Sequence, residues 1–295
     1  MAKASKRTTS RDSLAKHERF EQISPEVGEL DERAFDDALR EDADQALALL
    51  AEMTSATDPT LRELARRLAG RLSVDLSRRA GSMRRGIGRL ATRKMGDEIA
   101  EVDIDASIDA LLGTGTRLGI DVGELRVRDW SKPTTAICLV VDRSGSMGGR
   151  PLATAALFAA SVAARQPEDY SVLMFSSEAV AVKSQGAASS TERVVDAVLT
   201  LRGHGTTDLA GALRAANDQL MRSTASRKVT ILLSDCRSTS EEGTVEMASA
   251  LDELFVVAPG GDEDEARKFA ARVGARFTTI EGPSDVPRAF AQLID

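Results

Sequence analysis

Residues 136–147, Ala136-Ile-Cys-Leu-Val-Val-Asp-Arg-Ser-Gly-Ser-Met147, decide the fold, because an apolar run ends here in an aspartate and two alternating serines. A β-branched run of this length, stopped by a Gly/Ser turn, is typical of a strand buried on both faces. The Ala-rich stretch from Arg150 onward predicts a helix. The loop between them therefore has the position at which open α/β sheets bind ligands.

The side chains of this loop are hard oxygen donors. Asp142 supplies a carboxylate, Ser144 and Ser146 supply hydroxyls, and Gly145 lets the backbone turn tightly enough for the three to converge. This chemistry suits Mg²⁺ better than zinc. The alternative is that Asp142 and Ser146 only cap the following helix, since Ser, Thr and Asp are ordinary cap residues.

The composition is that of a soluble globular protein. The 295 residues suffice for about two domains, with 42% hydrophobic and 29% charged residues. A net charge of −7 and 3% aromatic residues argue against a nucleic-acid binder. The basic N-terminus is not followed by an apolar core, and no segment is long enough to span a bilayer, so we expect a cytoplasmic location. Cys138 and Cys236 are expected to be buried reduced thiols.

Three regions are predicted along the chain. Residues 1–30 are charged and lack periodicity, which is typical of a disordered tail. Residues 31–120 are expected to form a helical, Arg-rich region with a linker, and residues 121–295 an α/β domain. Apolar spacing predicts one helix from Phe35 to Met53, and Thr57-Asp58-Pro59 caps a second helix that runs to Leu76. We expect these two helices to form an antiparallel pair.

Basic residues are concentrated after position 61. This asymmetry in an acidic chain is typical either of a surface for an acidic partner or of a solvated helix face followed by a basic linker, and the sequence leaves both open. A short helix is predicted at residues 105–113 and an edge strand at residues 125–130. The basic residues are Arg62, Arg66, Arg67, Arg71, Arg78, Arg79, Arg84, Arg85, Arg89, Arg93 and Lys94.

Strands and helices alternate from residue 136 to the C-terminus. Strands are expected at 136–142, 170–175, 178–183, 229–235, 254–258 and 276–280, and helices at 151–165, 191–201, 209–221, 241–251, 263–273 and from 285. Such alternation predicts a doubly wound, mostly parallel α/β sheet. The short Ser176-Ser177 connection makes residues 170–175 and 178–183 paired strands, which places one antiparallel strand at an edge.

Two further features are expected to meet the first loop. Asp235 ends a second buried strand, and Gly203-His-Gly-Thr-Thr207-Asp208 is a Gly-rich loop that leads into a helix. If the two buried strands are neighbours, five oxygen-bearing residues converge above the sheet: Asp142, Ser144, Ser146, Thr207 and Asp235. His204 lies beside them, but imidazole is a poor Mg²⁺ ligand and a solvated loop histidine is the simpler interpretation.

This constellation resembles the metal-ion-dependent adhesion site (MIDAS) of the von Willebrand factor A (VWA) domain family, with its Asp-x-Ser-x-Ser, distant Thr and distant Asp. Residues 142–146 match the first element completely, and Thr207-Asp208-Leu209 matches the second. Asp235 matches the third. Cys236 departs from the glycine that many members carry after the last aspartate. The resemblance covers about residues 125–295 and implies a Rossmann-like VWA sheet.

The resemblance also implies roles for the five residues. Ser144, Ser146 and Thr207 would bind Mg²⁺, or else Mn²⁺ or Ca²⁺, directly. Asp142 and Asp235 would act through water. The open sixth position of such a site accepts a carboxylate from a partner, which an ion neutralised only indirectly by its aspartates attracts strongly.

A second, looser resemblance is to the bacterial CoxE-like and chelatase-associated VWA proteins, which work with MoxR-type AAA+ ATPases. It rests on residues 104–112, 125–130 and 141–147 and implies an AAA+ ATPase or a client protein as partner. The chain carries no Gly-x-x-x-x-Gly-Lys-Ser/Thr segment, so ATP hydrolysis is expected from another subunit. We therefore expect a non-catalytic adaptor in protein remodelling or metal-cofactor maturation.

Two alternatives remain. The first is a subunit of a magnesium or cobalt chelatase-like complex. The second is a metal-dependent hydrolase with Asp142 or Ser144 as nucleophile, for which the α/β domain offers no histidine besides His204 as a general base.

Overall fold

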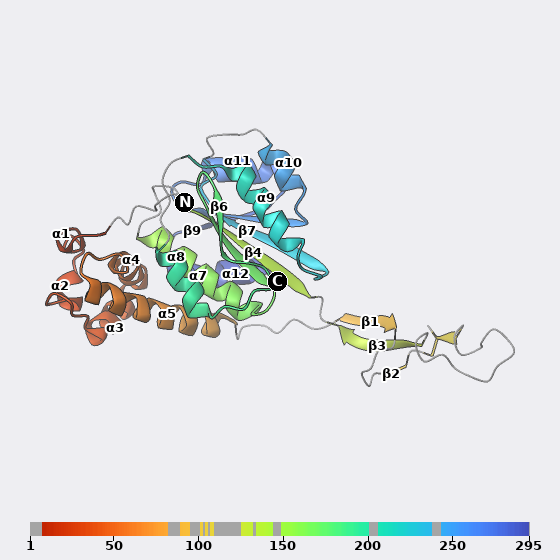
Figure 1. Cartoon of the computed structure of the whole chain (residues 1–295), viewed down its shortest axis with the longest axis horizontal. Helices are drawn as coiled ribbons and strands as arrows, with labels where there is room; N and C mark the ends of the chain where they lie inside the picture. Colours follow the sequence, from red (N-terminus) through yellow and green to blue (C-terminus); the bar gives the residue numbers. More distant parts are fainter. Residues whose placement is uncertain are drawn as a thin grey trace. The chain divides into compact units, whose positions relative to one another are not determined.

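The computed structural model describes residues 8–81, 89–94, 101–102, 104–105, 107–108, 125–131, 134–143, 149–200, 206–237 and 243–294 (Figure 1). The chain divides into two compact units. One joins Met1–Arg84 to Thr135–Asp295, and the other is Arg85–Thr134. The domain boundary expected near residue 120 therefore lies within the second unit and does not separate the two units.

A six-stranded sheet with the order β6-β5-β4-β7-β8-β9 forms the first unit's centre. Adjacent strands are parallel except for β5 and β6, which are antiparallel. The predicted mostly parallel sheet with one antiparallel edge strand is thus confirmed. The strands are β4 (Thr135–Asp142), β5 (Tyr170–Phe175), β6 (Ala179–Lys183), β7 (Arg227–Leu233), β8 (Glu253–Pro259) and β9 (Arg276–Ile280).

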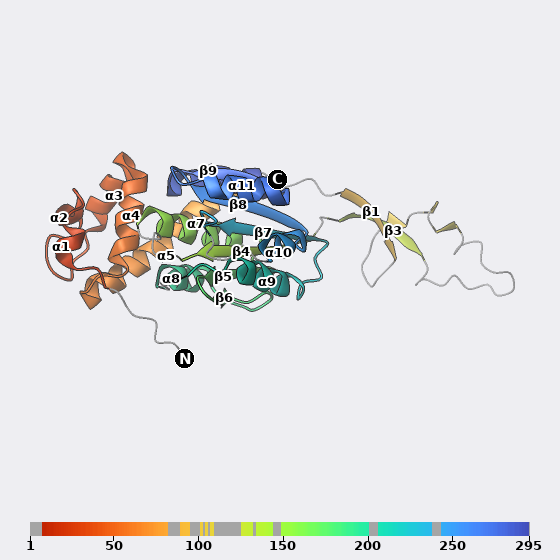
Figure 2. The same cartoon turned by 90° about the horizontal axis from the view of Figure 1, so that it is seen from above.

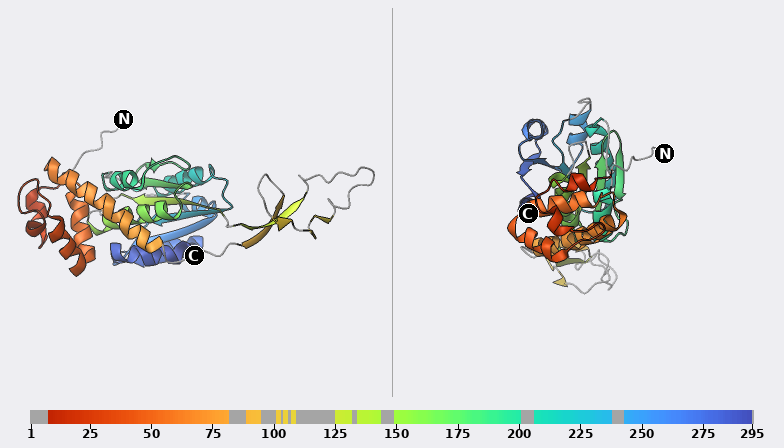
Figure 3. Two further views of the ribbon diagram at one scale, coloured as in Figure 1. Left: turned by 90° about the horizontal axis from the view of Figure 1, so that it is seen from below. Right: turned by 90° about the vertical axis from the view of Figure 1, so that its left-hand side faces the viewer.

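Strand β4 is central because both of its faces are covered. Ile137, Leu139 and Val141 belong to one hydrophobic cluster, whereas Cys138 and Val140 belong to another. Successive side chains of a strand point to opposite faces, so the uninterrupted apolar run supplies both layers. Figure 3 shows helices on each side of the sheet.

Among the described residues after β4, six α-helices and one 3-10 helix are interspersed with the strands, as the sequence predicts. Helices α7, α8 and α12 share a core with one face, and α9, α10 and α11 share a core with the other. The elements are α7 (Arg150–Arg165), α8 (Thr191–Thr200), α9 (Leu209–Leu220), α10 (Thr244–Ser249), α11 (Asp264–Val273), the 3-10 helix η2 (Pro283–Asp285) and α12 (Val286–Ile294).

The N-terminal region corrects two expectations. Residues 8–30 are not a tail in the structure, because they form α1 (Arg11–Leu14) and α2 (Phe20–Ile23) and bury Leu14, Phe20 and Ile23 in the main core. The single helix predicted from Phe35 divides into α3 (Glu32–Glu41) and α4 (Ala43–Met53) at Asp42. Asp42 is extended, with φ −142°, and its carboxylate caps α4 by accepting the Gln45 N–H.

Helix α5 (Pro59–Gly81) begins where its cap predicts, since Asp58 Oδ1 accepts the Leu61 N–H at 2.6 Å. It packs against α7 and α8, and α4 packs against α7 (Figure 2). The helical region therefore shares one hydrophobic core with the sheet. This explains why it is not a separate domain.

Of the four arginines of α5 whose side chains are described, three are ion-paired within the chain, and Arg62 donates to Ala56 O at 3.0 Å. This favours the solvated, ion-paired face over a free basic surface for this part of the helix. The residues from Arg78 to Lys94 lie outside the described side chains. The pairs are Arg66 with Asp196 at 3.5 Å, Arg67 with Glu63 at 3.0 Å and Arg71 with Glu32 at 2.6 Å.

The second unit contains β1 (Arg89–Lys94), β2 (Glu101–Val102) and β3 (Arg126–Ser131) in an antiparallel sheet of order β1-β3-β2. The strand predicted at residues 125–130 is therefore central to a small separate sheet and is not an edge of the large one. Most of the helix predicted at residues 105–113 lies outside the described residues. None of the described helices has the length and apolarity needed to cross a membrane.

Candidate metal site

Asp142 is the last residue of β4 and is only 2% exposed. The neighbouring strand β7 runs parallel to β4, with Val141 opposite Leu233, so both strands end at the same edge of the sheet. Ser234, just beyond β7, donates a hydrogen bond from its hydroxyl to Asp142 Oδ2 at 2.7 Å. The predicted adjacency of the two buried strands is confirmed, and this bond orients the carboxylate.

Asp235 follows Ser234 in a tight turn. The Ser234 hydroxyl accepts the Cys236 N–H at 2.9 Å, and Asp235 Oδ1 accepts the Arg237 N–H at 3.0 Å. Cys236 itself has φ +58°, a left-handed conformation that favours glycine. The backbone thus explains why a glycine fits after this aspartate, and the cysteine adopts a conformation that glycine favours.

Thr207 precedes α9 and is 6% exposed. The next residue, Asp208, donates its N–H to Ser176 O at 2.8 Å and caps α9 by accepting the Gly211 N–H at 2.9 Å. Because Ser176 directly follows β5, the neighbour of β4 on the other side, this loop is tied to the same edge of the sheet. Asp142 therefore ends β4, and Asp235 follows the adjacent strand β7. Thr207 lies in a loop that is bonded to the end of β5, on the other side of β4.

Ser144, Ser146 and His204 lie outside the described residues. Within the described part of the chain, no group of three or more His, Cys, Asp or Glu side chains is placed to hold a metal. The candidate site depends instead on two carboxylates together with hydroxyl oxygens. Carboxylate and hydroxyl oxygens are the ligands that a hard divalent cation prefers, so the donor set fits Mg²⁺.

The two thiols take no part in such a site. Burial raises the pKa of Cys138 to about 12. Burial, followed by the nearby carboxylates of Asp235 and Asp142, raises the pKa of Cys236. Both side chains are free, buried and protonated at neutral pH, as the sequence predicts. A protonated thiol is not a metal ligand, which leaves the oxygen donors as the relevant chemistry.

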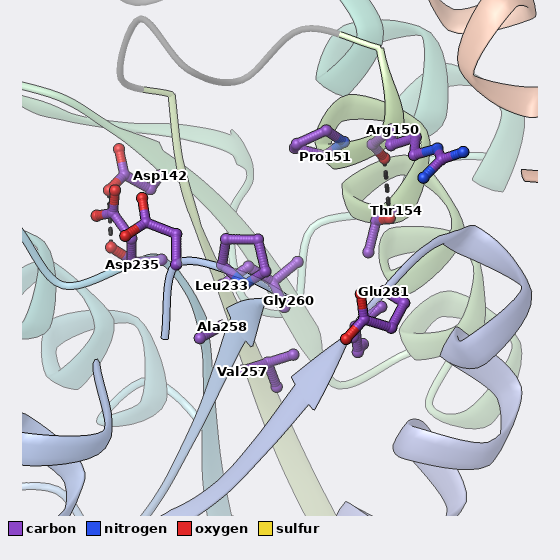
Figure 4. A pocket seen from close by; sticks show the side chains of 14 residues that line it. Asp142, Arg150, Pro151, Thr154, Leu233, Asp235, Val257, Ala258, Gly260 and Glu281 are labelled. Atoms are coloured by element: carbon purple, nitrogen blue, oxygen red, sulfur yellow. Dashed lines mark hydrogen bonds between the residues drawn. The ribbon is translucent and has the colours of Figure 1, made fainter. Parts of the chain in front are cut away.

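A cavity of about 360 Å³ adjoins the two aspartates (Figure 4). It extends from the ends of β4 and β7 across the ends of β8 and β9 to the first turn of α7. Its lining consists of Asp142, Arg150, Pro151, Thr154, Leu233, Ser234, Asp235, Val257, Ala258, Pro259, Gly260, Asp262, Ile280 and Glu281.

Sequence reasoning did not identify two contributions. Ser234 was predicted only as part of a strand end, although a serine directly before the strand-terminal aspartate is a usable signal. Glu52 Oε2 of α4 lies 3.1 Å from His17 Nε2, and Glu52 Oε1 lies 2.9 Å from the position a Cβ would take on Gly149. Gly149 directly precedes α7, so Glu52 of α4 contacts the chain just before that helix. No local sequence pattern predicts this contact.

Comparison with known proteins identifies the sheet. The family model described as von Willebrand factor type A domain matches residues 136–283, about half of the chain. A comparison with curated protein sequences found no match.

Similar solved structures were found at low sequence identity. A von Willebrand factor type A protein from Catenulispora acidiphila is 19% identical, with a TM-score of 0.45; the match covers 57% of this chain and 43% of that one. The conserved hypothetical protein BatB from Bacteroides thetaiotaomicron is 14% identical, with a TM-score of 0.45; the match covers 54% of this chain and 97% of that one. Proximal thread matrix protein 1 of the mussel byssus is 14% identical, with a TM-score of 0.47; the match covers 55% of this chain and 47% of that one. The chain thus spans less than half the length of the first of these structures.

Proposed function

The chain belongs to the von Willebrand factor type A domain family, and from this membership we propose that it is a non-catalytic, Mg²⁺-dependent docking protein for a partner's acidic side chain. Domains of this family generally mediate protein–protein interaction or adhesion. Beyond this general role, we propose that binding by this chain uses a Mg²⁺ ion and an acidic side chain of the partner.

The observation that carries the proposal is the hydrogen bond from Ser234 to Asp142. It orients a buried carboxylate at the edge of the sheet where Asp235 and Thr207 also lie. Mg²⁺ prefers oxygen ligands and retains open or water-filled positions in most protein sites. A carboxylate oriented in this way supports an ion that is accessible from one side.

The metal would be held by the residues that the family pattern assigns. Ser144, Ser146 and Thr207 would bind it directly, and Asp142 and Asp235 would do so through water. The bound ion, Mg²⁺ or alternatively Mn²⁺ or Ca²⁺, would supply the positive charge that attracts a partner's Asp or Glu. Ser234 and the turn at Cys236 would keep the two aspartates in place.

The helical region is proposed as a second contact surface. Helix α4 lies beside the loop that starts at Asp142, through Glu52 at Gly149, and Asp44 of the same helix accepts hydrogen bonds from Ser284 N–H at 2.8 Å and Ser284 Oγ at 3.0 Å. A partner bound at the metal would therefore meet α4 as well. This arrangement favours recognition of a folded protein over capture of an isolated acidic residue.

We propose a MoxR-type AAA+ ATPase, or a client protein of such an ATPase, as the partner. The support is the looser resemblance to the CoxE-like group together with the lack of a phosphate-binding Gly-x-x-x-x-Gly-Lys-Ser/Thr segment in the sequence. In this scheme the chain contributes binding and the ATPase contributes energy. The process served would be protein remodelling or metal-cofactor maturation.

The test is calorimetric titration of the full chain with MgCl₂, followed by Mg²⁺-dependent pulldown of a co-expressed MoxR-type ATPase from the same genome. Asp142→Asn, which keeps the shape and a hydrogen-bond acceptor, should abolish Mg²⁺ binding and capture. Asp37→Asn, at an exposed position of α3, is the matched control and should change neither.

Equal capture by the wild type and Asp142→Asn, in Mg²⁺ and in EDTA alike, would refute the docking proposal. Turnover of ATP or aryl phosphates by the purified chain would contradict its non-catalytic part.

A further inference from the structure

The cavity beside the aspartates carries carboxylates at both ends and is apolar in its middle (Figure 4). At one end lie Asp142 and Asp235. Its middle is apolar and is built from Leu233, Val257 and Ile280, which are 6%, 3% and 4% exposed. At the far end lies Glu281, just beyond β9. We call this cavity the β8–β9 groove.

We propose that the β8–β9 groove is a specificity subsite for the partner segment that carries the metal-binding acidic residue, with a large apolar side chain in its middle and a basic side chain at Glu281. This inference rests on the proposed function and deepens it. It identifies the partner by an ordered pattern of acidic, apolar and basic side chains.

Continuity with the metal site is the first argument. Asp142 and Asp235 line the groove themselves, so a carboxylate bound at their metal brings the residues next to it to the groove's entrance. A peptide in an extended conformation advances about 3.3 Å per residue, so the following few side chains reach the ends of β8 and β9. The peptide that supplies the metal-binding carboxylate can therefore also occupy the β8–β9 groove.

The apolar floor is the second argument. A volume of about 360 Å³ lies within the range of cavities that bind ligands, and one Leu- or Phe-sized side chain fits such a space. Val257, Ala258 and Ile280 come from strand ends that the sheet holds rigidly, so the surface exists before binding. Burying one large apolar side chain there strengthens binding by about tenfold to a hundredfold.

Charge at the far end is the third argument. The Glu281 carboxylate lies against the backbone of Gly260, where a Cβ would collide with it. Neighbouring carboxylates are compensated, since Asp262 pairs with Arg237 and Asp285 pairs with Arg288. In the part of the chain that the structure describes, Glu281 pairs with no cation, which leaves it available for a partner's Lys or Arg.

Arg150 does not offset this charge. Its guanidinium is on the rim, but Figure 4 shows it turned away from the other lining side chains. The groove's far end is therefore acidic, and a basic side chain complements it. An acidic side chain at this end would be repelled.

The experiment uses an immobilised array of hexapeptides that each contain one Asp, with the positions on both sides varied through all residue types. The full chain is applied in MgCl₂ and in EDTA. We expect Mg²⁺-dependent binding that selects large apolar residues near the Asp and Lys or Arg beyond them. Amide hydrogen exchange should then show protection of residues 257–260 by the best peptide.

Two pairs of variants locate the effect. Thr154→Phe fills the groove from the first turns of α7, and we expect at least about tenfold weaker binding of apolar-containing peptides; Thr154→Val is the control of similar size. Glu281→Lys should invert the preference at the basic position toward Asp or Glu, by about fivefold, whereas Glu281→Gln should only remove it. None of these residues is a proposed metal ligand.

The outcomes separate the two proposals. If Asp-containing peptides bind with Mg²⁺ but show no selectivity at neighbouring positions, or bind Thr154→Phe as tightly as the wild type, the groove inference is overturned and the docking function stands. If no peptide binds in Mg²⁺ but the Mg²⁺-dependent pulldown succeeds, the groove inference is overturned and the docking function stands; if both fail, both are overturned. Inverted selectivity in Glu281→Lys supports the inference directly.

Discussion

The hydroxyl of Ser234 donates a 2.7 Å hydrogen bond to Oδ2 of Asp142, across 92 residues of sequence. It joins the ends of two adjacent parallel strands and uses the same oxygen that accepts the Cys236 N–H. One side chain thus orients the carboxylate at the end of β4 and the turn that presents Asp235. The geometry of the candidate metal site depends on this serine, although it is not a ligand.

Replacing this serine should therefore affect both stability and metal binding. Ser234→Ala removes the hydrogen bond to Asp142 Oδ2 and the acceptor of the Cys236 N–H, and we expect the free energy of unfolding to fall by about 1–3 kcal/mol. Mg²⁺ affinity should fall as well. Urea unfolding and calorimetry measure the two effects. Ser161→Ala, which removes a buried hydroxyl bonded to Leu157 O within α7, is the control and should leave Mg²⁺ affinity unchanged.

Asp142 is buried, with 2% of its surface exposed. Removing its charge should therefore not destabilise the metal-free protein, because an ionised buried carboxylate is itself costly. We expect Asp142→Asn to unfold in EDTA at or above the wild-type urea midpoint. Its midpoint should not rise on addition of MgCl₂, whereas the wild-type midpoint should. A rise of equal size in both proteins would contradict Asp142 as a participant in metal binding.

Cys236 has a left-handed backbone, which costs a residue with a Cβ about 1–2 kcal/mol. Cys236→Gly removes that strain but also removes a buried thiol and adds freedom to the unfolded chain, so we expect the unfolding free energy to change by less than about 1 kcal/mol. Cys236→Val should instead lose about 2 kcal/mol or more, because a β-branched residue tolerates this conformation poorly. Equal stability of the two variants would show that the turn does not require positive φ.

Gly149 has φ +56° and ψ −117°, a conformation that only glycine adopts readily, and it faces Glu52. Gly149→Ala should lower the unfolding free energy by about 1–3 kcal/mol. In the double variant with Glu52→Ala, only the part of this loss of unfolding free energy that comes from the collision with the Glu52 carboxylate should be recovered. Thermal unfolding of the single and double variants separates the two causes. Full recovery in the double variant would mean that backbone strain at Gly149 is negligible.

Lys183 is buried at the end of β6, where its ammonium donates to Tyr170 O at 2.5 Å and lies over the Tyr170 ring. Burial lowers the pKa of Lys183 below its usual range, and nearby Asp169 opposes this only in part. The folded state therefore releases this proton at lower pH than the unfolded state, so unfolding free energy should rise with pH from the folded pKa up to about 10.4. Lys183→Met should lack this rise when the two pH profiles are compared. Identical profiles would contradict the lowered pKa.

The motifs of the candidate site and the alternation of strands and helices could be predicted because each depends on local pattern. The apolar run 136–141 is buried whatever its neighbours are, and Asp58 caps α5 through its own local hydrogen bond. The tail expected at residues 1–30 was wrong for residues 8–30, for a non-local reason. Leu14, Phe20 and Ile23 belong to two helices of only four residues, too short for a sustained periodic pattern, yet all three are buried in the core.

By itself, the sequence determined the family, the strand that ends at Asp142 and the set of oxygen donors, because these follow from hydrophobic pattern and residue chemistry. Only the tertiary structure decided that β4 lies beside β7, that α4 reaches Gly149 and that a groove runs from Asp142 to Glu281. These relationships join residues far apart in the chain. They arise from burying both faces of one sheet at once, which no single segment encodes.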